Sequence, residues 1–226
     1  MFSSKKVRVC AMLTLVLLIM GGVFLSDIPA WLKYKKGDIK DYNQVKAGEL
    51  QKGDLVRGTI DQVLGACAEE YKTSYGVRTS DKSSKLYYVL WMDNEQFVLY
   101  EASGGSFEKL DKITDETVAY YKSLADAKDS GDLSEVVQQN ETMEFEGRVV
   151  ALPSKIEGYF KEWYDETFDD NEFSTSIEKV MIRPVKFDRL QLLVILGFVF
   201  ALLGIVGIVL TVLVWKREKN NQQYGY

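Results

Sequence analysis

Two long apolar runs frame this chain, and a polar stretch separates them. The second run, Leu190–Trp215, contains 26 residues and no charged side chain. A helix needs about 20 apolar residues to cross the hydrocarbon core of a bilayer, so this run has length to spare for tilt. Lys216, Arg217 and Lys219 follow it at once and can lie among lipid headgroups. The pattern predicts a transmembrane helix over residues 190–215.

The first apolar run, Val9–Leu25, follows a basic segment at residues 1–8. A positive start before an apolar run occurs in cleavable signal peptides and in uncleaved anchors. The residues after this run do not offer the small-x-small pattern of a cleavage site, since Phe24 precedes Ser26 by two positions. We therefore favour an uncleaved transmembrane helix over residues 9–31.

Aromatic and small residues indicate how these helices meet their surroundings. Tryptophan and tyrosine rings gather at the headgroup level of membranes. The residues expected at this interface are Trp31, Tyr34 and Trp215. Small side chains let helices approach closely, and they predict either packing of the two spans against each other or a homodimer through the second span. The small residues concerned are Gly197, Ala201 and Gly204.

The positive-inside rule does not decide the topology, because basic residues flank both spans at both ends. A short charged N-terminus tends to stay in the cytosol while the following segment is threaded outward. We therefore expect a two-span protein of the cell membrane, with residues 1–8 and the tail 216–226 in the cytosol. Residues 32–189 then form an extracytoplasmic domain.

Short strand-like runs recur along residues 32–189. Apolar and polar residues alternate, or β-branched and aromatic residues cluster, at residues 54–65 with a continuation through 66–73, and at 86–92, 97–100, 143–152 and 176–185. Asp93–Glu95 separates two such runs and predicts a β-hairpin over residues 86–100. A polar linker is predicted at residues 33–51 and a loop at residues 74–85.

Helical patterns interrupt the strands. Residues 114–128 have a candidate N-cap at Thr114 and an apolar stripe that comprises Val118, Tyr121, Leu124 and Ala125. Residues 132–139 predict a short second helix. Ser154–Glu157 matches a capping box and begins an amphipathic helix. The fold predicted is α+β: two transmembrane helices flank a mainly antiparallel β domain with two or three helices, for which a small OB-like barrel is one architecture.

Composition excludes several classes of function. The chain has no histidine, which removes Ser-His-Asp and Cys-His catalysis and the commonest zinc ligand. Residues 32–189 hold 31 acidic and 22 basic side chains, a net charge of −9, whereas nucleic-acid binding needs a basic face. Cys10 lies in the first apolar run and Cys67 in the domain, so no disulfide is expected, and Cys67 is interpreted as a small buried hydrophobe.

Two groups of residues in the domain are candidates for binding. An acidic run offers a hard cation the carboxylates of Asp165, Asp169 and Glu172, although it lacks the glycine and spacing of an EF-hand loop. A solvated helix end is the alternative interpretation. The aromatic residues of the hairpin and the last helix either fill the core or line a groove for a peptide, glycan or lipid. The candidates for surface contacts are Tyr87, Tyr88 and Tyr164.

The order of span, β-rich domain and span resembles small two-span membrane proteins of Gram-positive bacteria that form a family of unknown function. The segments that carry this resemblance are DLVRGTIDQVLG, YYVLWMDNEQFVLY and EFEGRVVALP. The chain is also similar to other membrane-tethered OB-like domains. The resemblance implies an OB-like extracytoplasmic domain and supplies no catalytic motif.

These observations favour a non-catalytic role, as a scaffold or accessory subunit of an envelope complex that binds a membrane or envelope protein through the domain. Tethering at both ends keeps the domain within reach of membrane partners. One alternative is an envelope hydrolase that uses paired carboxylates, and another is a sensor that signals through a membrane partner. We expect the lipid bilayer as a partner, no nucleic acid and no cofactor.

Overall fold

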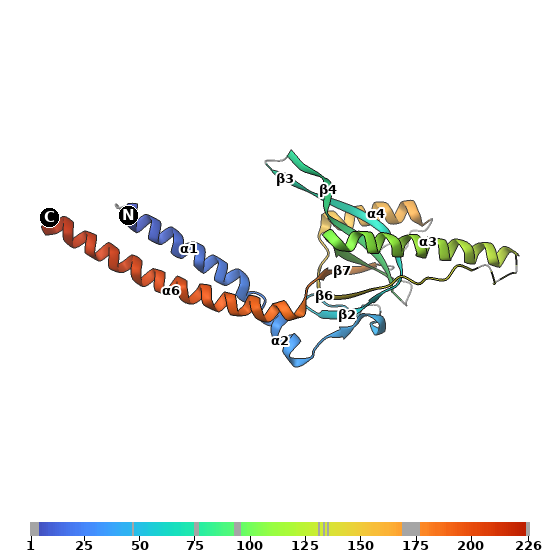
Figure 1. Ribbon diagram of the computed structural model, residues 1–226, viewed down its shortest axis with the longest axis horizontal. Helices are drawn as coiled ribbons and strands as arrows, with labels where there is room; N and C mark the ends of the chain where they lie inside the picture. Colours follow the sequence, from blue (N-terminus) through green and yellow to red (C-terminus); the bar gives the residue numbers. More distant parts are fainter. Residues whose placement is uncertain are drawn as a thin grey trace. The chain divides into compact units, whose positions relative to one another are not determined.

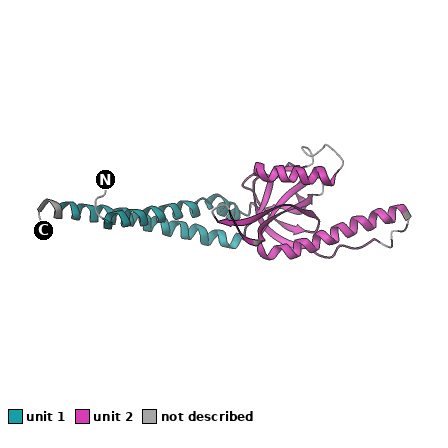
Figure 2. Ribbon diagram, turned by 90° about the horizontal axis from the view of Figure 1, so that it is seen from above, with its two compact units in different colours: residues 1–37, 186–226 teal, residues 38–185 magenta. Residues whose placement is uncertain are grey.

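The computed structural model describes residues 5–46, 48–74, 77–92, 96–130, 132, 134, 136–168 and 177–224. Its contacts divide the chain into two compact units (Figure 2). The helical unit comprises residues 1–37 and 186–226, and the sheet unit comprises residues 38–185. The protein is therefore α+β, with two helices that are long and apolar enough to cross a membrane.

The helical unit contains α1 (Lys5–Leu25), α2 (Ile28–Lys36) and α6 (Phe187–Tyr224), which Figure 1 shows in blue and red. A turn at Ser26 and Asp27 separates α1 from α2, and Pro29 then occupies the first turn of α2. Gly37 ends α2 with a φ of 71°, and its N–H donates to the carbonyl groups of Lys33 and Tyr34. The first apolar helix thus ends at Leu25 rather than at residue 31, because a proline-led helix begins beyond the turn.

Small residues let α1 and α6 pack closely as an antiparallel pair. A Cβ added to Gly21 would lie 2.9 Å from the backbone nitrogen of Ala201, and one added to Gly204 would lie 2.5 Å from the Leu18 side chain. Along α1, Val7, Thr14 and Gly21 are the buried residues, at a spacing of seven. This spacing is that of a coiled-coil seam, with small residues in place of large ones.

The sheet unit is built on one mixed sheet whose strand order is β1-β2-β6-β7-β5-β4-β3. The strands are β1 (Lys40–Asp41), β2 (Leu55–Ile60), β3 (Val63–Ser74), β4 (Val77–Met92), β5 (Gln96–Ala102), β6 (Met143–Ala151) and β7 (Ile177–Pro184). β1 pairs with β2 and β5 with β7 in parallel, and the other four pairings are antiparallel. The mainly antiparallel sheet is therefore confirmed, whereas the OB-like barrel stays a prediction.

Helices cover both faces of this sheet, α3 (Phe107–Ser130) on one side and α4 (Ser154–Thr167) on the other (Figure 2). Alternate residues of each central strand therefore enter different cores. In β4, Tyr88 and Leu90 join the cluster that contains Leu110 of α3, whereas Tyr87 and Val89 join the cluster that contains Phe160 of α4. Burial on both faces explains why the sequence of this hairpin is continuously apolar instead of alternating between apolar and polar residues.

The predicted β4–β5 hairpin is confirmed, with Trp91 opposite Phe97, and its turn at residues 93–95 lies outside the described residues. The loop predicted at residues 74–85 is wrong, because residues 77–85 belong to β4 and pair with β3. The polar residues there occupy a two-stranded extension exposed to solvent, where strands need no apolar side chains.

The linker predicted at residues 33–51 is also wrong, because its second half packs on the sheet. The side-chain amide of Asn43 donates to Thr59 O and accepts from Thr59 N. It thus makes the two hydrogen bonds that the backbone of a neighbouring strand would make to β2. A Cβ on Gly58 would lie 2.6 Å from Asn43 Oδ1 and 2.7 Å from Tyr42 Cβ. The chain therefore approaches the Gly58 backbone so closely that only glycine fits.

α3 begins seven residues before the predicted start, and its apolar stripe is shifted. Thr114 lies inside the helix, where its hydroxyl donates to Leu110 O, so it is not an N-cap. Leu110 and Ile113 face the sheet, whereas Val118 is 55% exposed. Ser154 is likewise not the N-cap of α4, because Pro153 holds that position without a side-chain cap. The helix predicted at residues 132–139 is wrong for residues 136–139, which have no regular structure.

Candidate partner-binding surface of the sheet unit

A row of charged side chains crosses the sheet on the α4 side, just beyond the apolar residues that α4 covers. In strand order the row comprises Arg57 of β2, Glu146 and Arg148 of β6, Arg183 of β7, Glu101 of β5, Lys85 of β4 and Glu70 of β3. All seven side chains share the face of Val150, Met181 and Leu99 because side chains alternate along a strand. We call this set the charged row.

Glu101 is the centre of the charged row. Its side chain is 8% exposed, and it is held by two cations from neighbouring strands. Lys85 Nζ lies 2.9 Å from Glu101 Oε1, and the Arg183 guanidinium lies 3.0 Å from Glu101 Oε2. A carboxylate this buried needs such partners because an unpaired charge would be strongly destabilising.

The outer members of the charged row are more accessible to solvent. Arg57 lies 2.6 Å from Glu146 on the adjacent strand, and the Arg57 side chain is 55% exposed. Glu70 accepts a hydrogen bond of 3.0 Å from the Tyr87 hydroxyl and is 47% exposed. The row therefore has a rigid centre and accessible cations and carboxylates at its ends, which is a surface suited to a polar protein partner.

The charged row also lies where the chain enters and leaves the sheet unit. Lys40 pairs with Val56, Val56 with Gly147, and Gly147 with Pro184. These four residues thus form one transverse row, next to Arg57 and Arg183. Both covalent connections to the helical unit leave the sheet at this row, so the sheet is tethered at one end of its strands.

The three tyrosines proposed as surface contacts are buried, with exposed fractions of 2%, 1% and 2% for Tyr87, Tyr88 and Tyr164. Their expected surface position is wrong, because the sheet is covered on both faces and each ring belongs to a core cluster. Burial, and a hydrogen bond to Glu70 or Asp111 respectively, raise the pKa of Tyr87 and of Tyr88. Both hydroxyls therefore stay protonated and act as structural donors.

Aromatic rings form a continuous array around the other end of the central strands. Trp91 stacks on Tyr121 of α3 with ring centroids 5.9 Å apart, and it meets Phe97 edge-on at 5.3 Å. Phe97 in turn contacts Tyr164 and Phe168 at the end of α4. The array joins the two helices across the sheet, which agrees with the interpretation of the aromatic surplus as core.

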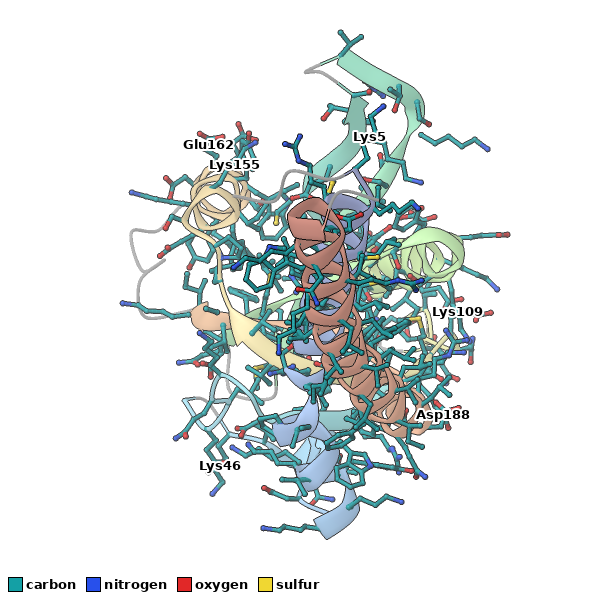
Figure 3. The ribbon with its side chains drawn as sticks, turned by 90° about the vertical axis from the view of Figure 1, so that its left-hand side faces the viewer. Lys5, Lys46, Lys109, Lys155, Glu162 and Asp188 are labelled. Carbon is teal, nitrogen blue, oxygen red and sulfur yellow. The ribbon has the colours of Figure 1, made fainter. Side chains whose placement is uncertain are left out.

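The predicted cation site is only partly described. Asp165 is exposed on α4, whereas Asp169 and Glu172 lie outside the described residues. Among the residues that are described, no group of three or more potential ligands is arranged to hold a metal ion. Lys155 and Glu162 project from the outer side of the same helix (Figure 3).

Among the described residues, the carboxyl groups whose pKa values are shifted are all shifted downward. Hydrogen bonds from the backbone N–H groups of Glu141 and Asn140 lower the pKa of Glu116, and side-chain hydrogen bonds lower that of Glu69. A general acid needs the opposite shift. Burial raises the pKa of Cys67 to about 12, so its thiol is protonated at neutral pH.

In the helical unit, the residues expected at the membrane interface lie in α2 and in the C-terminal part of α6. Trp31 and Tyr34 are half-buried in α2, and Trp215 in α6 is 44% exposed. Gly197, Ala201 and Gly204 lie on the side of α6 that faces α1, so this stripe is occupied within the chain.

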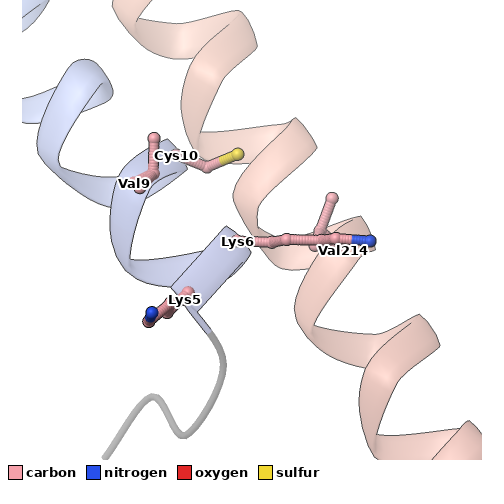
Figure 4. Close-up of a pocket in the computed structure, with 5 residues that line it drawn as sticks. All are labelled: Lys5, Lys6, Val9, Cys10 and Val214. Atoms are coloured by element: carbon pink, nitrogen blue, oxygen red, sulfur yellow. The ribbon is translucent and has the colours of Figure 1, made fainter.

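A depression between α1 and α6 is lined by Lys5, Lys6, Val9, Cys10 and Val214 (Figure 4). Its lining combines apolar side chains with two lysines and brings no carboxylate or hydroxyl together. These lining residues therefore do not form a recognisable catalytic site.

The fold and surface define a protein with two potentially membrane-spanning helices and an α+β domain whose most distinctive surface is a charged row. The chain belongs to the family described as Domain of unknown function (DUF8577), whose model matches residues 1–214. No curated protein and no solved structure matches the chain.

Proposed function

We propose that this protein is a non-catalytic scaffold or accessory subunit of a membrane or envelope complex, anchored by α1 and α6 and binding a partner protein through the charged row. The observation that carries the proposal is the rigid, partly exposed row of charges centred on Glu101. Its fixed ion pairs preorganise side chains from six strands, and preorganised polar groups favour specific association.

The anchoring part of the proposal rests on the helical unit. α1 and α6 are antiparallel, so the two ends of the chain lie at the same end of the helical pair (Figure 1). Lys5 and Val214 accordingly line the same depression there. If both helices span a bilayer, both termini face one side. We propose that this side is the cytosol and that the sheet unit lies outside.

Protease accessibility of the sheet unit tests the topology. Cleavage in intact host cells, with the N-terminus protected until lysis, is the expected result. Protection of the sheet unit until lysis would instead place it in the cytosol and refute an envelope partner.

Site-directed photo-crosslinking in the host cells tests the binding surface. A photoreactive residue at Arg57, at an exposed end of the charged row, is expected to give a discrete adduct with one partner protein. The matched control is Lys109, an exposed residue of α3 on the opposite side of the sheet. The adduct should also weaken when Glu70→Lys reverses an exposed charge in the row. An equal adduct from Lys109, or none from Arg57, would contradict this assignment.

A further inference from the structure

The short helix α2 has one packed side and one side that meets nothing in the helical unit. Ala30 is 1% exposed, and the Tyr34 ring lies 5.6 Å from that of Phe187 in α6. On the other side, Leu32 is 44% exposed, and Lys35 and Lys36 are exposed beside it. An apolar residue between exposed lysines is typical of a helix that lies in a membrane interface.

The charges of the helical unit are separated from those of the sheet unit. Residues 1–37 and 186–226 carry 11 basic and 3 acidic side chains, a net charge of +8, whereas residues 38–185 carry 17 basic and 30 acidic ones, a net charge of −13. Anionic lipids therefore attract the helical unit and repel the sheet unit. Near α2 the basic residues of the helical unit are Lys33, Lys35, Lys36, Lys186 and Arg189.

Trp31 offers a spectroscopic probe of this helix. Its indole nitrogen is buried within the protein. Helical spacing places Lys35 one turn beyond Trp31, on the same side of α2. Trp31 fluorescence therefore reports on lipid that gathers around Lys35 and its neighbours in α2.

We propose that α2 is an interfacial helix that binds anionic phospholipid headgroups in the leaflet at its end of the helical pair. Lys35 and Lys36 attract the lipid phosphate, and Leu32 enters the acyl region. This inference is independent of any protein partner of the charged row. It implies that the protein concentrates anionic lipid around its own anchor.

Trp31 fluorescence in vesicles tests this proposal. The full chain, with Trp91, Trp163 and Trp215 changed to phenylalanine, is reconstituted in phosphatidylcholine that contains one-fifth brominated lipid. The brominated lipid is either phosphatidylglycerol or phosphatidylcholine with identical chains, so only the headgroup differs. Selective binding predicts stronger quenching by the anionic lipid. Each lysine contributes an enrichment of about fivefold at low salt.

Matched double variants locate the effect. Lys35→Gln with Lys36→Gln should reduce the preference for the anionic lipid strongly, whereas Lys5→Gln with Lys6→Gln, at the other end of α1, should leave the preference unchanged. Equal quenching by both lipids in the parent protein would overturn the proposal, as would a preference that the α2 substitutions do not reduce. Native mass spectrometry of the chain with all four tryptophans, released from mixed-lipid nanodiscs, gives a second readout: the α2 variant should carry fewer anionic lipids than the parent.

Discussion

Gly21 and Gly22 are adjacent in α1, yet the packing of α1 against α6 gives them opposite roles. A Cβ on Gly21 would lie 2.9 Å from the backbone nitrogen and 3.2 Å from the Cα of Ala201. A Cβ on Gly22 would have nothing within 4 Å. Gly21→Ala and Gly22→Ala therefore make the same chemical change at two neighbouring helical positions, one inside the seam and one outside it.

The magnitude follows from two effects. Replacing glycine by alanine inside a helix contributes up to about 1 kcal/mol of stability in water, and both variants share this gain. Only Gly21→Ala drives a methyl group into the backbone of the partner helix, where no side chain can rotate away. Overpacking of this kind typically costs about 1–3 kcal/mol. We expect Gly21→Ala to unfold more easily than Gly22→Ala by about 1–3 kcal/mol, with Gly22→Ala at least as stable as the parent.

Energy transfer between α1 and α6 measures the difference. A dansyl group on Cys10 accepts energy from Trp215, and Cys10 lies beside Val214 in the described depression. In a Cys67→Ala background in which Trp31, Trp91 and Trp163 are changed to phenylalanine, only Cys10 is labelled and only Trp215 donates energy. Titration with sodium dodecyl sulfate in mixed micelles then gives the free energy of separating the helices. Equal midpoints for the two variants, within about 0.5 kcal/mol, would refute the seam described for Gly21.

Three further predictions concern the sheet unit. Gly58→Ala should destabilise the sheet unit by about 1–3 kcal/mol, because the new methyl group would overlap Asn43. Gly158→Ala, in open space on α4, should stabilise the sheet unit by up to about 1 kcal/mol. Urea unfolding of the two variants measures both changes in stability. Because burial raises the pKa of Cys67 from 9.0 to about 12, maleimide at pH 8 should label it about 1,000-fold more slowly than an ordinary thiol. The folded-state pKa of Glu116 is lowered from 4.5, so the stability that its carboxylate contributes should be complete above pH 4.5 and lost as the pH falls through the folded-state pKa. Urea unfolding at a series of pH values should therefore show that the difference in stability between the parent and Glu116→Gln disappears in acid. A difference that persists in acid would contradict this reasoning.

Sequence patterns predicted the elements whose signal is local. The charge-free run at residues 190–215 indicated a long apolar helix because helix length and hydropathy are read directly from consecutive residues. The β4–β5 hairpin followed from two apolar runs around a short polar turn. Helix boundaries were less accurate: α3 begins at Phe107 because its first turn packs on the sheet, which overrides the capping preference of Thr114.

Tertiary structure alone decided the charged row and the burial of the tyrosines. Glu101, Lys85 and Arg183 belong to three strands, and nothing in their local sequence specifies that β5 lies between β4 and β7. Whether Tyr87 and Tyr88 were exposed depended on α3 and α4 covering opposite faces of the sheet, which no alternation within β4 could reveal. The sequence by itself thus determined the two long apolar helices, the acidic charge of the domain and its local strands. The order of those strands, a non-local property, determined which side chains meet and form a surface.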